Sequence, residues 1–177
     1  GEGDVAGGAA ANGYGLHESF SDMWFDEVNN PQAVFVTGYN DDSGDQTKKN
    51  NGYDNSTRPG SNGTGGGSNQ PSELLLNAFP MKDGKKIDEA SETYPYDTTL
   101  FYKNRDPRFD ATIAYNGAVW PLNGIANYKL WTYTVNGKST ENGKVSSTGL
   151  YCRKAINPSV ATGDAQYVGT DWMEIRY

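Results

Sequence analysis

The chain has 177 residues and a formal net charge of −7 at pH 7, which argues against nucleic-acid binding and against a polybasic membrane-surface binder, since both need basic patches. Hydrophobic residues make up only 35% of the chain and glycine occurs 22 times, so we expect a single loop-rich domain with a modest core. One cysteine and no long apolar run exclude an internal disulfide and a transmembrane helix.

The first predicted elements are a helix and a buried strand. Residues 1–15 carry no pattern and are expected to be loop. Apolar side chains then recur at helical spacing and predict a helix over residues 16–28, while the nearly continuous apolar run over 33–39 predicts a fully buried strand. His17, the only histidine, is interpreted as a surface or capping group, because a lone histidine has no second ligand with which to share a metal.

A polar stretch over residues 40–70 is expected to be a long flexible loop. Tyr53 and Arg58 are its only large side chains able to grip a ligand. No zinc-ligand cluster, EF-hand spacing or phosphate-binding glycine loop is present, so we expect no metal and no cofactor. Residues 71–79 are predicted to form a short helix with proline in its first turn, followed by a turn at 82–85.

The segment around Asp106-Pro107 is predicted to be a structural corner. Proline pushes the preceding residue out of the helical region, and the flanking Arg105 and Arg108 can fork onto carboxylates or carbonyls. Strict alternation over residues 109–115 then predicts a half-buried strand. We interpret this corner as a structural ion cluster rather than an active site, because ion networks usually hold structure. Its structural residues are Asn104, Arg105, Asp106, Pro107 and Arg108.

An aromatic turn and strand follow the corner. Trp120 lies in a turn, and residues 128–135 are predicted to form a strand that places Trp131 and Tyr133 on one face. Asn136-Gly137 predicts a two-residue hairpin. These aromatic side chains are equally compatible with a platform that stacks on a sugar ring and with a ridge of the core.

The last predicted elements are a strand over residues 145–156 and a helix over 172–177, capped by Asp171. A helix of one turn is not stable alone. We therefore expect the chain to be a fragment of a longer protein.

Five segments, in order, resemble the SusD/RagB family. They are Asn-Pro-Gln-Ala-Val-Phe-Val at 30–36, the short helix and Asp-Gly turn at 71–84, Asn-Arg-Asp-Pro-Arg-Phe with its following segment at 104–117, Ser-Thr-Gly-Leu-Tyr-Cys-Arg-Lys at 147–154, and Trp-Met-Glu-Ile-Arg-Tyr at 172–177. Gln32 stands where the family usually has glutamate.

The resemblance implies a glycan-binding lipoprotein exposed on the outer-membrane surface of Bacteroidetes. Its signal and lipid-attachment segment would lie upstream of this chain. The implied fold is a loop-rich α+β lobe over residues 1–177, with short helices and a few antiparallel strands, and with TPR-like helices outside this chain. The implied function is to hold a polysaccharide or oligosaccharide for nutrient uptake and to pass it to a SusC-like TonB-dependent transporter, without catalysis.

The candidate glycan-binding residues combine flat aromatic faces with one cation. They are Trp120, Trp131, Tyr133, Tyr53 and Arg58. Two alternatives stay open: a lobe that docks to the transporter without a sugar site of its own, and a glycoside hydrolase, although no motif selects the two carboxylates such an enzyme needs. Serine–histidine chemistry would rest wholly on His17, and no nucleophile elbow is present.

Overall fold

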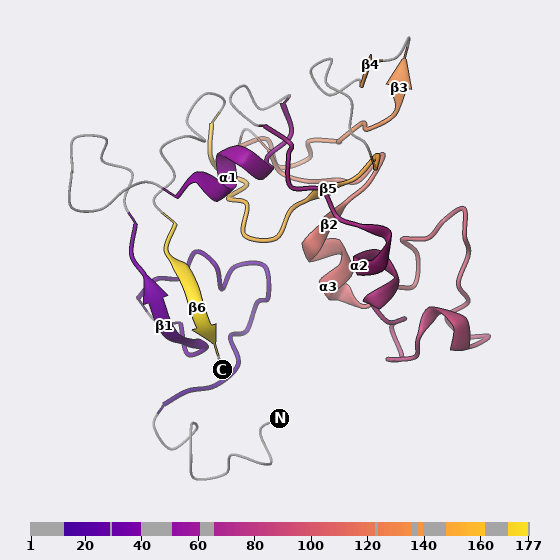
Figure 1. The fold of residues 1–177 in the computed structure, drawn as a ribbon. Coiled ribbons are helices and arrows are strands. Elements are labelled where there is room, and N and C mark those ends of the chain that lie inside the picture. Colours follow the sequence, from indigo (N-terminus) through magenta and orange to yellow (C-terminus); the bar gives the residue numbers. More distant parts are fainter. Residues whose placement is uncertain are drawn as a thin grey trace.

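The fold is a loop-rich assembly of short helices and short strands (Figure 1). The computed structural model describes residues 13–28, 30–39, 51–60, 66–122, 124–135, 138–139, 148–161 and 170–176. In chain order the elements are β1 (Ala33–Thr37), α1 (Gly52–Thr57), α2 (Glu73–Ala78), η4 (Ile87–Glu89), α3 (Pro107–Thr112), β2 (Ile113–Ala114), β3 (Thr134–Val135), β4 (Lys138–Ser139), β5 (Tyr151–Cys152) and β6 (Trp172–Arg176). This arrangement confirms the predicted α+β class.

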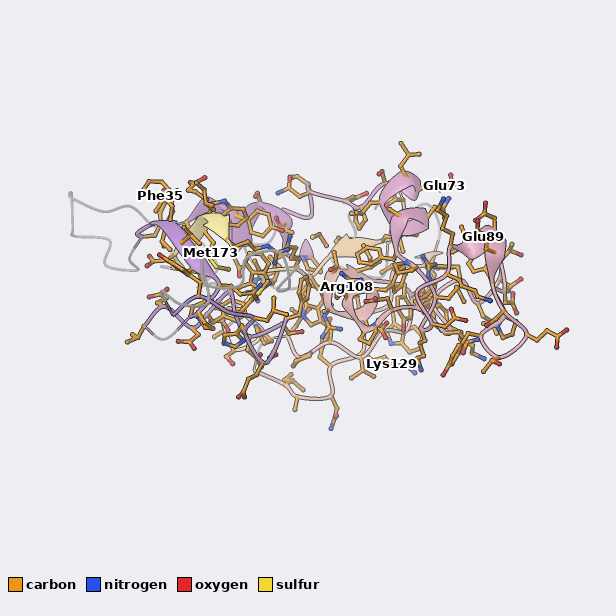
Figure 2. All side chains as sticks on the ribbon, turned by 90° about the horizontal axis from the view of Figure 1, so that it is seen from below. Phe35, Glu73, Glu89, Arg108, Lys129 and Met173 are labelled. Carbon is orange, nitrogen blue, oxygen red and sulfur yellow. The ribbon has the colours of Figure 1, made fainter. Side chains whose placement is uncertain are left out.

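The described strands form three antiparallel pairs, β1 with β6, β2 with β5, and β3 with β4. Two of the pairs join segments that are far apart in the sequence. Figure 1 shows the β1–β6 pair on one side of the molecule and α2 beside α3 on the other, with β2 and β5 between them. In the view of Figure 2, Phe35 of β1 and Met173 of β6 lie toward one end, and Glu73 and Glu89 toward the other.

In the part of the chain that the structure describes, buried hydrophobic side chains gather in three clusters. The central cluster consists of Ala114, Trp120, Leu122, Leu130, Tyr151 and Ile156. The α2–α3 cluster consists of Leu76, Phe109, Ile113 and Leu150. The amino-terminal cluster consists of Met23, Trp24 and Ala155. The strands β2 and β5 contribute to the first two clusters, so their pairing holds those two together.

Residues 16–28 form turns rather than the predicted helix. Met23 N–H donates to Ser19 O at 3.1 Å, but Phe25 N–H donates to Asp22 O at 2.9 Å, which is the spacing of a tight turn. His17 Nδ1 accepts from Ser19 N–H at 3.0 Å, a local contact that caps no helix because none forms here. The apolar side chains that suggested a helix are instead gathered by the amino-terminal cluster.

The predicted strand over 33–39 is present as β1, but the prediction that it is fully buried was wrong. Val34, Phe35 and Val36 are 43%, 58% and 38% exposed. Among the described strands β1 pairs only with β6, and at this edge of the molecule its apolar side chains keep part of their surface in contact with solvent. The apolar run therefore predicted the strand correctly, but it did not predict how exposed the side chains of the strand are.

The end of the chain corrects a second prediction. Residues 172–176 form β6 rather than a helix, and Phe35 lies opposite Ile175 in the antiparallel pair. Asp171 accepts a hydrogen bond from Tyr39 N–H at 2.7 Å instead of capping a helix. A single helical turn has little stability of its own, whereas β1 offers a row of backbone partners.

The segment after Asp106 is helical where a strand was predicted. Pro107 occupies the first position of α3, and Asp106 Oδ1 caps the helix by accepting from Arg108 N–H at 2.9 Å. Phe109 and Ile113 are both fully buried and are four positions apart. This spacing places two side chains on one face of a helix and also on one face of a strand, so it does not distinguish the two. Only Ile113–Ala114 remains as strand, in β2.

Residues 128–135 show the predicted alternation, although the strand itself is limited to β3. Leu130 and Thr132 are buried, while Trp131 and Tyr133 are exposed. Val135 of β3 lies opposite Lys138 of β4, which confirms the predicted hairpin, and Asn136-Gly137 lies outside the described residues. The predicted strand over 145–156 is reduced to β5, and its first three residues lie outside the described ranges.

The stretch 40–70 is not loop throughout. Residues 52–57 form α1, because Asn51 caps the helix by accepting from Tyr53 N–H at 2.9 Å. Residues 40–50 and 61–65 lie outside the described ranges. The next predicted helix is confirmed as α2, capped by Ser72, so that proline at position 71 precedes the helix instead of lying within its first turn. The predicted turn at 82–85 is also present, with Gly84 N–H donating to Met81 O at 2.9 Å.

Candidate functional site

The corner before α3 is built around a buried arginine. Arg105 is 3% exposed and donates to the carbonyl oxygens of Phe101 and Phe79, each at 2.8 Å, and to that of Leu76. Its guanidinium also lies 4.7 Å from the ring centroid of Phe109. Arg105 thus ties the carboxyl end of α2 to α3, and its contacts are internal to the fold.

The neighbours of Arg105 make similarly local contacts. The Asp106 carboxylate accepts two hydrogen bonds from the Arg108 guanidinium, from Nε to Oδ1 at 2.8 Å and from Nη2 to Oδ2 at 2.7 Å. This hydrogen bonding lowers the pKa of Asp106. Asn104 adopts a left-handed backbone at φ 57° and donates to Pro95 O at 3.0 Å. The side chains of the corner therefore bond to one another and to nearby backbone, which is compatible with the predicted structural role.

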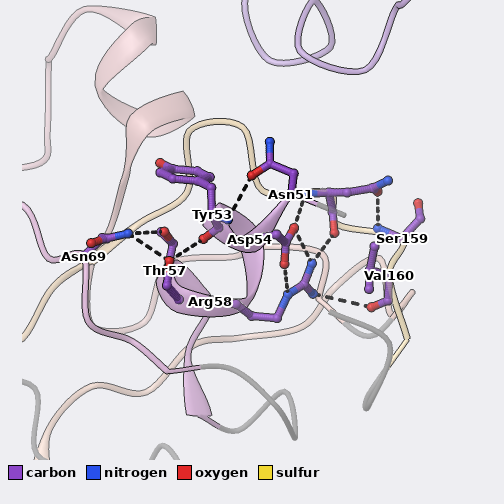
Figure 3. Close-up of polar contacts among 10 residues, drawn as sticks. Asn51, Tyr53, Asp54, Thr57, Arg58, Asn69, Ser159 and Val160 are labelled. Atoms are coloured by element: carbon purple, nitrogen blue, oxygen red, sulfur yellow. Dashed lines mark hydrogen bonds and ion pairs between the residues drawn. The ribbon is translucent and has the colours of Figure 1, made fainter. Parts of the chain in front are cut away.

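Arg58, a candidate for glycan binding, is the fully buried residue that follows the last residue of α1, and it is paired (Figure 3). Its Nε donates to Asp54 Oδ1 at 2.6 Å and its Nη2 to Asp54 Oδ2 at 2.9 Å. It also donates to Asn157 O at 2.8 Å and Val160 O at 3.4 Å. This buried network corrects the expectation for Arg58, because its donors hold residues 157–160 against α1 and do not face solvent.

Two further candidates belong to the interior. Trp120 is 1% exposed in the central cluster, so the structure selects the core alternative for this ring. Tyr53 is half-buried, its ring lies 5.1 Å from that of Trp172, and its hydroxyl donates to Lys154 O at 3.0 Å. The Trp120 ring is therefore covered by protein atoms, and Tyr53 packs partly buried against the central and amino-terminal clusters.

Trp131 and Tyr133 lie on the surface and close to each other. They are 42% and 49% exposed, with ring centroids 6.2 Å apart at 76°. Lys129 places its ammonium 4.8 Å from the centroid of the Trp131 ring. Gly117 packs beneath the ring at φ 82°, where a Cβ atom would lie 3.6 Å from Trp131. Of the five predicted glycan-binding residues, the structure brings these two together at an exposed position.

A cleft of about 510 Å³ opens beside Trp131, within the usual size range of small-molecule sites. It is lined by Tyr102, Asp110, Tyr115, Asn116, Gly117, Ala118, Val119, Lys129 and Arg153. Tyr102 and Tyr115 stack with ring centroids 4.2 Å apart and only 8° between their planes. The cleft thus combines an aromatic wall with polar and charged side chains.

Backbone hydrogen bonds hold the walls of this cleft in place. The β2–β5 pair continues into a bond from Arg153 N–H to Thr112 O at 2.8 Å, which positions Arg153 beside α3. Gly117 N–H donates to Leu130 O at 2.7 Å, and Asn116 Oδ1 accepts from Thr132 N–H at 2.9 Å. The segment that carries Lys129 and Trp131 is therefore fixed against the segment that follows β2.

The ionisable groups of the cleft respond to their partial burial. Loss of water raises the pKa of Asp110 and lowers that of Arg153, since burial disfavours both charged forms. Loss of water, together with the nearby Asp110 carboxylate, raises the pKa of Tyr115 to about 12. Tyr115 therefore stays protonated at neutral pH, and its hydroxyl lies 3.4 Å from Asp110 Oδ1.

Sequence reasoning did not propose four residues of this cleft: Tyr102, Asp110, Tyr115 and Arg153. The two tyrosines flank the Asp-Pro corner, but they meet only because α3 reverses the chain between them. The assumed strand over 109–115 also placed Asp110 and Tyr115 on opposite faces. The aromatic content around the corner was the available signal, although it did not distinguish core from surface.

Neither metal ligation nor membrane insertion is indicated by the described residues. No three histidine, cysteine, aspartate or glutamate side chains come close enough to hold a metal ion in this part of the chain. Within the same ranges, no helix has the length and apolar character needed to cross a bilayer.

Comparison with family models assigns this chain to a protein family. The family model described as "SusD family" matches residues 31–177. The chain belongs to the SusD family. No curated protein matches it.

Two solved structures from Bacteroides fragilis share the SusD-family fold with this chain. A SusD-like carbohydrate-binding protein is 23% identical, with a TM-score of 0.69 over 98% of this chain and 34% of that protein. A second SusD-like protein is 25% identical, with a TM-score of 0.66 over 99% of this chain and 37% of that protein. This chain spans roughly a third of the length of each.

Proposed function

We propose that this SusD-family chain binds carbohydrate non-covalently in the cleft between Tyr102 and Lys129, as part of nutrient uptake. The observation that carries the proposal is the composition of the cleft, where stacked tyrosines adjoin an exposed tryptophan and several hydrogen-bonding side chains. Aromatic faces pack against the apolar faces of sugar rings, while polar groups bond the hydroxyls. Membership of a family that includes a carbohydrate-binding protein supports the same conclusion.

In this mechanism the protein supplies contact rather than chemistry. Tyr102 and Tyr115 present a rigid wall, because each ring already packs on the other. Asn116, Asp110 and Arg153 offer donors and acceptors at the same opening. Trp131 and Tyr133 extend the aromatic surface beyond the cleft, so that a chain of several sugars can lie across it.

A second part of the proposal concerns the cellular setting. We infer that the protein is a lipoprotein exposed on the outer-membrane surface and that it hands oligosaccharide to a SusC-like TonB-dependent transporter. Family membership supports this setting. The rival proposal is a lobe that only docks to the transporter, which could also use exposed aromatic side chains. The polar and charged side chains that line the cleft beside the stacked tyrosines favour glycan binding.

The composition of the cleft also bears on the hydrolase alternative. A glycoside hydrolase needs two carboxyl groups about 5 to 10 Å apart. Asp110 is the one acidic side chain among the described residues that line the cleft. This composition supports binding without catalysis.

Titration against bacterial, plant and host polysaccharides tests the proposal. Binding is followed by calorimetry, and release of reducing ends is measured in the same samples. We expect binding without release, weakened at least about tenfold by Trp131→Ala and by Tyr102→Ala, since burial of an aromatic face contributes on the order of 1 to 3 kcal/mol.

Phe35→Ala is the matched control, because Phe35 is 58% exposed and belongs to β1, outside the cleft (Figure 2). Circular dichroism checks that each variant keeps its fold. Release of reducing ends would contradict the non-catalytic proposal. Equal weakening by Trp131→Ala and Phe35→Ala would contradict the assignment of the site.

A further inference from the structure

Arg153 and Lys129 differ from the paired arginines of this chain. Arg58, Arg105 and Arg108 all donate hydrogen bonds to carboxylates or carbonyls. Arg153 is half-buried, and its guanidinium lies 5.9 Å from the centroid of the Trp120 ring. It feels the charge of Asp110, but within the described ranges it forms no ion pair with it. The ammonium of Lys129 likewise contacts only the ring of Trp131 there. Both cations line the cleft with their hydrogen-bond donors unused.

The local charge of the cleft is opposite to that of the whole chain. The chain carries a net charge of −7, whereas the side chains lining the cleft contribute two cations and one carboxylate. A partly desolvated guanidinium gains strongly from an anion, because charge interactions are stronger away from bulk water.

We propose that the cleft selects acidic glycans, in which a sugar carboxylate bridges Arg153 and Lys129 while sugar rings rest on the aromatic wall. The planar guanidinium fork matches a carboxylate in a bidentate geometry, and the ammonium of Lys129 supplies a point charge in the same cleft. This inference rests on the proposed function and adds the substrate class. Neutral glycans would leave the donors of Arg153 with only hydroxyl acceptors.

A matched pair of ligands tests this inference. An oligogalacturonate and its fully methyl-esterified form share sugar rings and linkages, and they differ in the charge of the carboxyl group. Calorimetric titration of the 177-residue chain is expected to give at least about tenfold tighter binding of the acid, because hydrogen bonds to charged groups exceed those to neutral groups. Raising the salt concentration should reduce the difference.

Variants assign the preference to the two cations. Arg153→Gln and Lys129→Gln should each reduce the preference for the acid by about tenfold, because each variant loses more affinity for the acid than for the ester. Lys86→Gln, which removes the same charge from an exposed position just before η4, should change neither affinity. A preference for acid that survives both cleft variants would overturn the inference.

The outcomes separate this inference from the proposed function. Equal affinity for acid and ester would overturn the acidic-glycan inference and leave glycan binding intact. Tighter binding of a sulfated glycan than of the oligogalacturonate would overturn the assignment of a carboxylate. Binding of no polysaccharide in the wider panel would overturn the proposed function and the inference with it.

Discussion

Asp106 joins two roles in one side chain. Its Oδ1 caps α3 through the Arg108 N–H, and the same carboxylate receives the guanidinium fork of Arg108. The cap satisfies a backbone donor that the helix leaves unpaired. The ion pair adds less, because the Arg108 side chain is 55% exposed and water screens the charges.

Two substitutions at Asp106 separate these roles. Asp106→Ala removes both the cap and the ion pair, and we expect the free energy of unfolding to fall by about 0.5 to 2 kcal/mol. Asp106→Asn keeps a side-chain oxygen for the cap, and we expect it to lower the free energy of unfolding by less than about 1 kcal/mol. Urea unfolding measures both values, and equal losses would contradict the assignment of the larger share to the cap.

The acid dependence of stability follows from the lowered pKa of Asp106. A carboxyl group whose pKa is lower in the folded state stabilises the fold above its unfolded pKa of about 3.9, and this contribution is lost as pH falls through the folded pKa. The stability difference between the natural chain and Asp106→Asn should therefore be constant above about pH 5 and shrink below about pH 4. Urea unfolding across this range measures it, and a difference that grew at low pH would contradict the sign.

At the scale of elements, a buried ion pair at helix α1 also forms hydrogen bonds to the backbone of a segment about 100 residues later in the chain (Figure 3). Asp54 of α1 and Arg58, the residue that caps the end of α1, are four positions apart, and both side chains are nearly inaccessible to solvent. Asp54 also accepts from Asn157 N–H at 3.1 Å, while Arg58 donates to the carbonyls of Asn157 and Val160. The pair thereby anchors residues 157–160, which continue from the wall that carries Arg153.

Removal of one partner should be strongly destabilising. Asp54→Ala leaves the Arg58 guanidinium buried without a carboxylate, and we expect a loss of about 3 to 5 kcal/mol in the free energy of unfolding. The double variant Asp54→Leu with Arg58→Met should lose less, because no charge is left buried. Asp88→Ala, at an exposed position of η4, serves as the control and should stay within about 0.5 kcal/mol of the natural chain. A double variant less stable than the single one would contradict the argument.

At the scale of the whole molecule, the described core consists of three small clusters instead of one. Tyr53 packs against both the central and the amino-terminal cluster, and β2 with β5 connects the central cluster to the α2–α3 cluster. Each cluster contains few large side chains. Small, weakly connected cores favour local opening over a single cooperative transition.

We therefore expect thermal unfolding in steps that depend on the probe. Variants that retain Trp24 or Trp120 as the sole tryptophan, with the others changed to Phe, report on the amino-terminal and central clusters respectively. The two fluorescence transitions should differ in midpoint, and far-ultraviolet circular dichroism should give a broad transition. Coincident, sharp transitions by all three measurements would contradict a divided core.

Much of the fold class was predictable because it depends on local signals. Ser72 caps α2 through its own neighbours, and the alternation from Leu130 to Tyr133 assigns buried and exposed faces without reference to distant residues. The Asp-Pro corner also follows from local sterics, and the ordered motifs around it predicted the family. Two of the five proposed glycan contacts, Trp131 and Tyr133, lie exposed beside the cleft.

Tertiary structure decided the features that depend on contacts between distant segments. Residues 172–176 become a strand because β1 lies beside them, and Trp120 and Arg58 are buried because other segments close over them. The cleft itself joins residues from 102 to 153, which no local pattern connects. Backbone propensity and side-chain spacing act over a few residues, whereas burial and the meeting of Asp110, Lys129 and Arg153 are set only when the whole chain has packed.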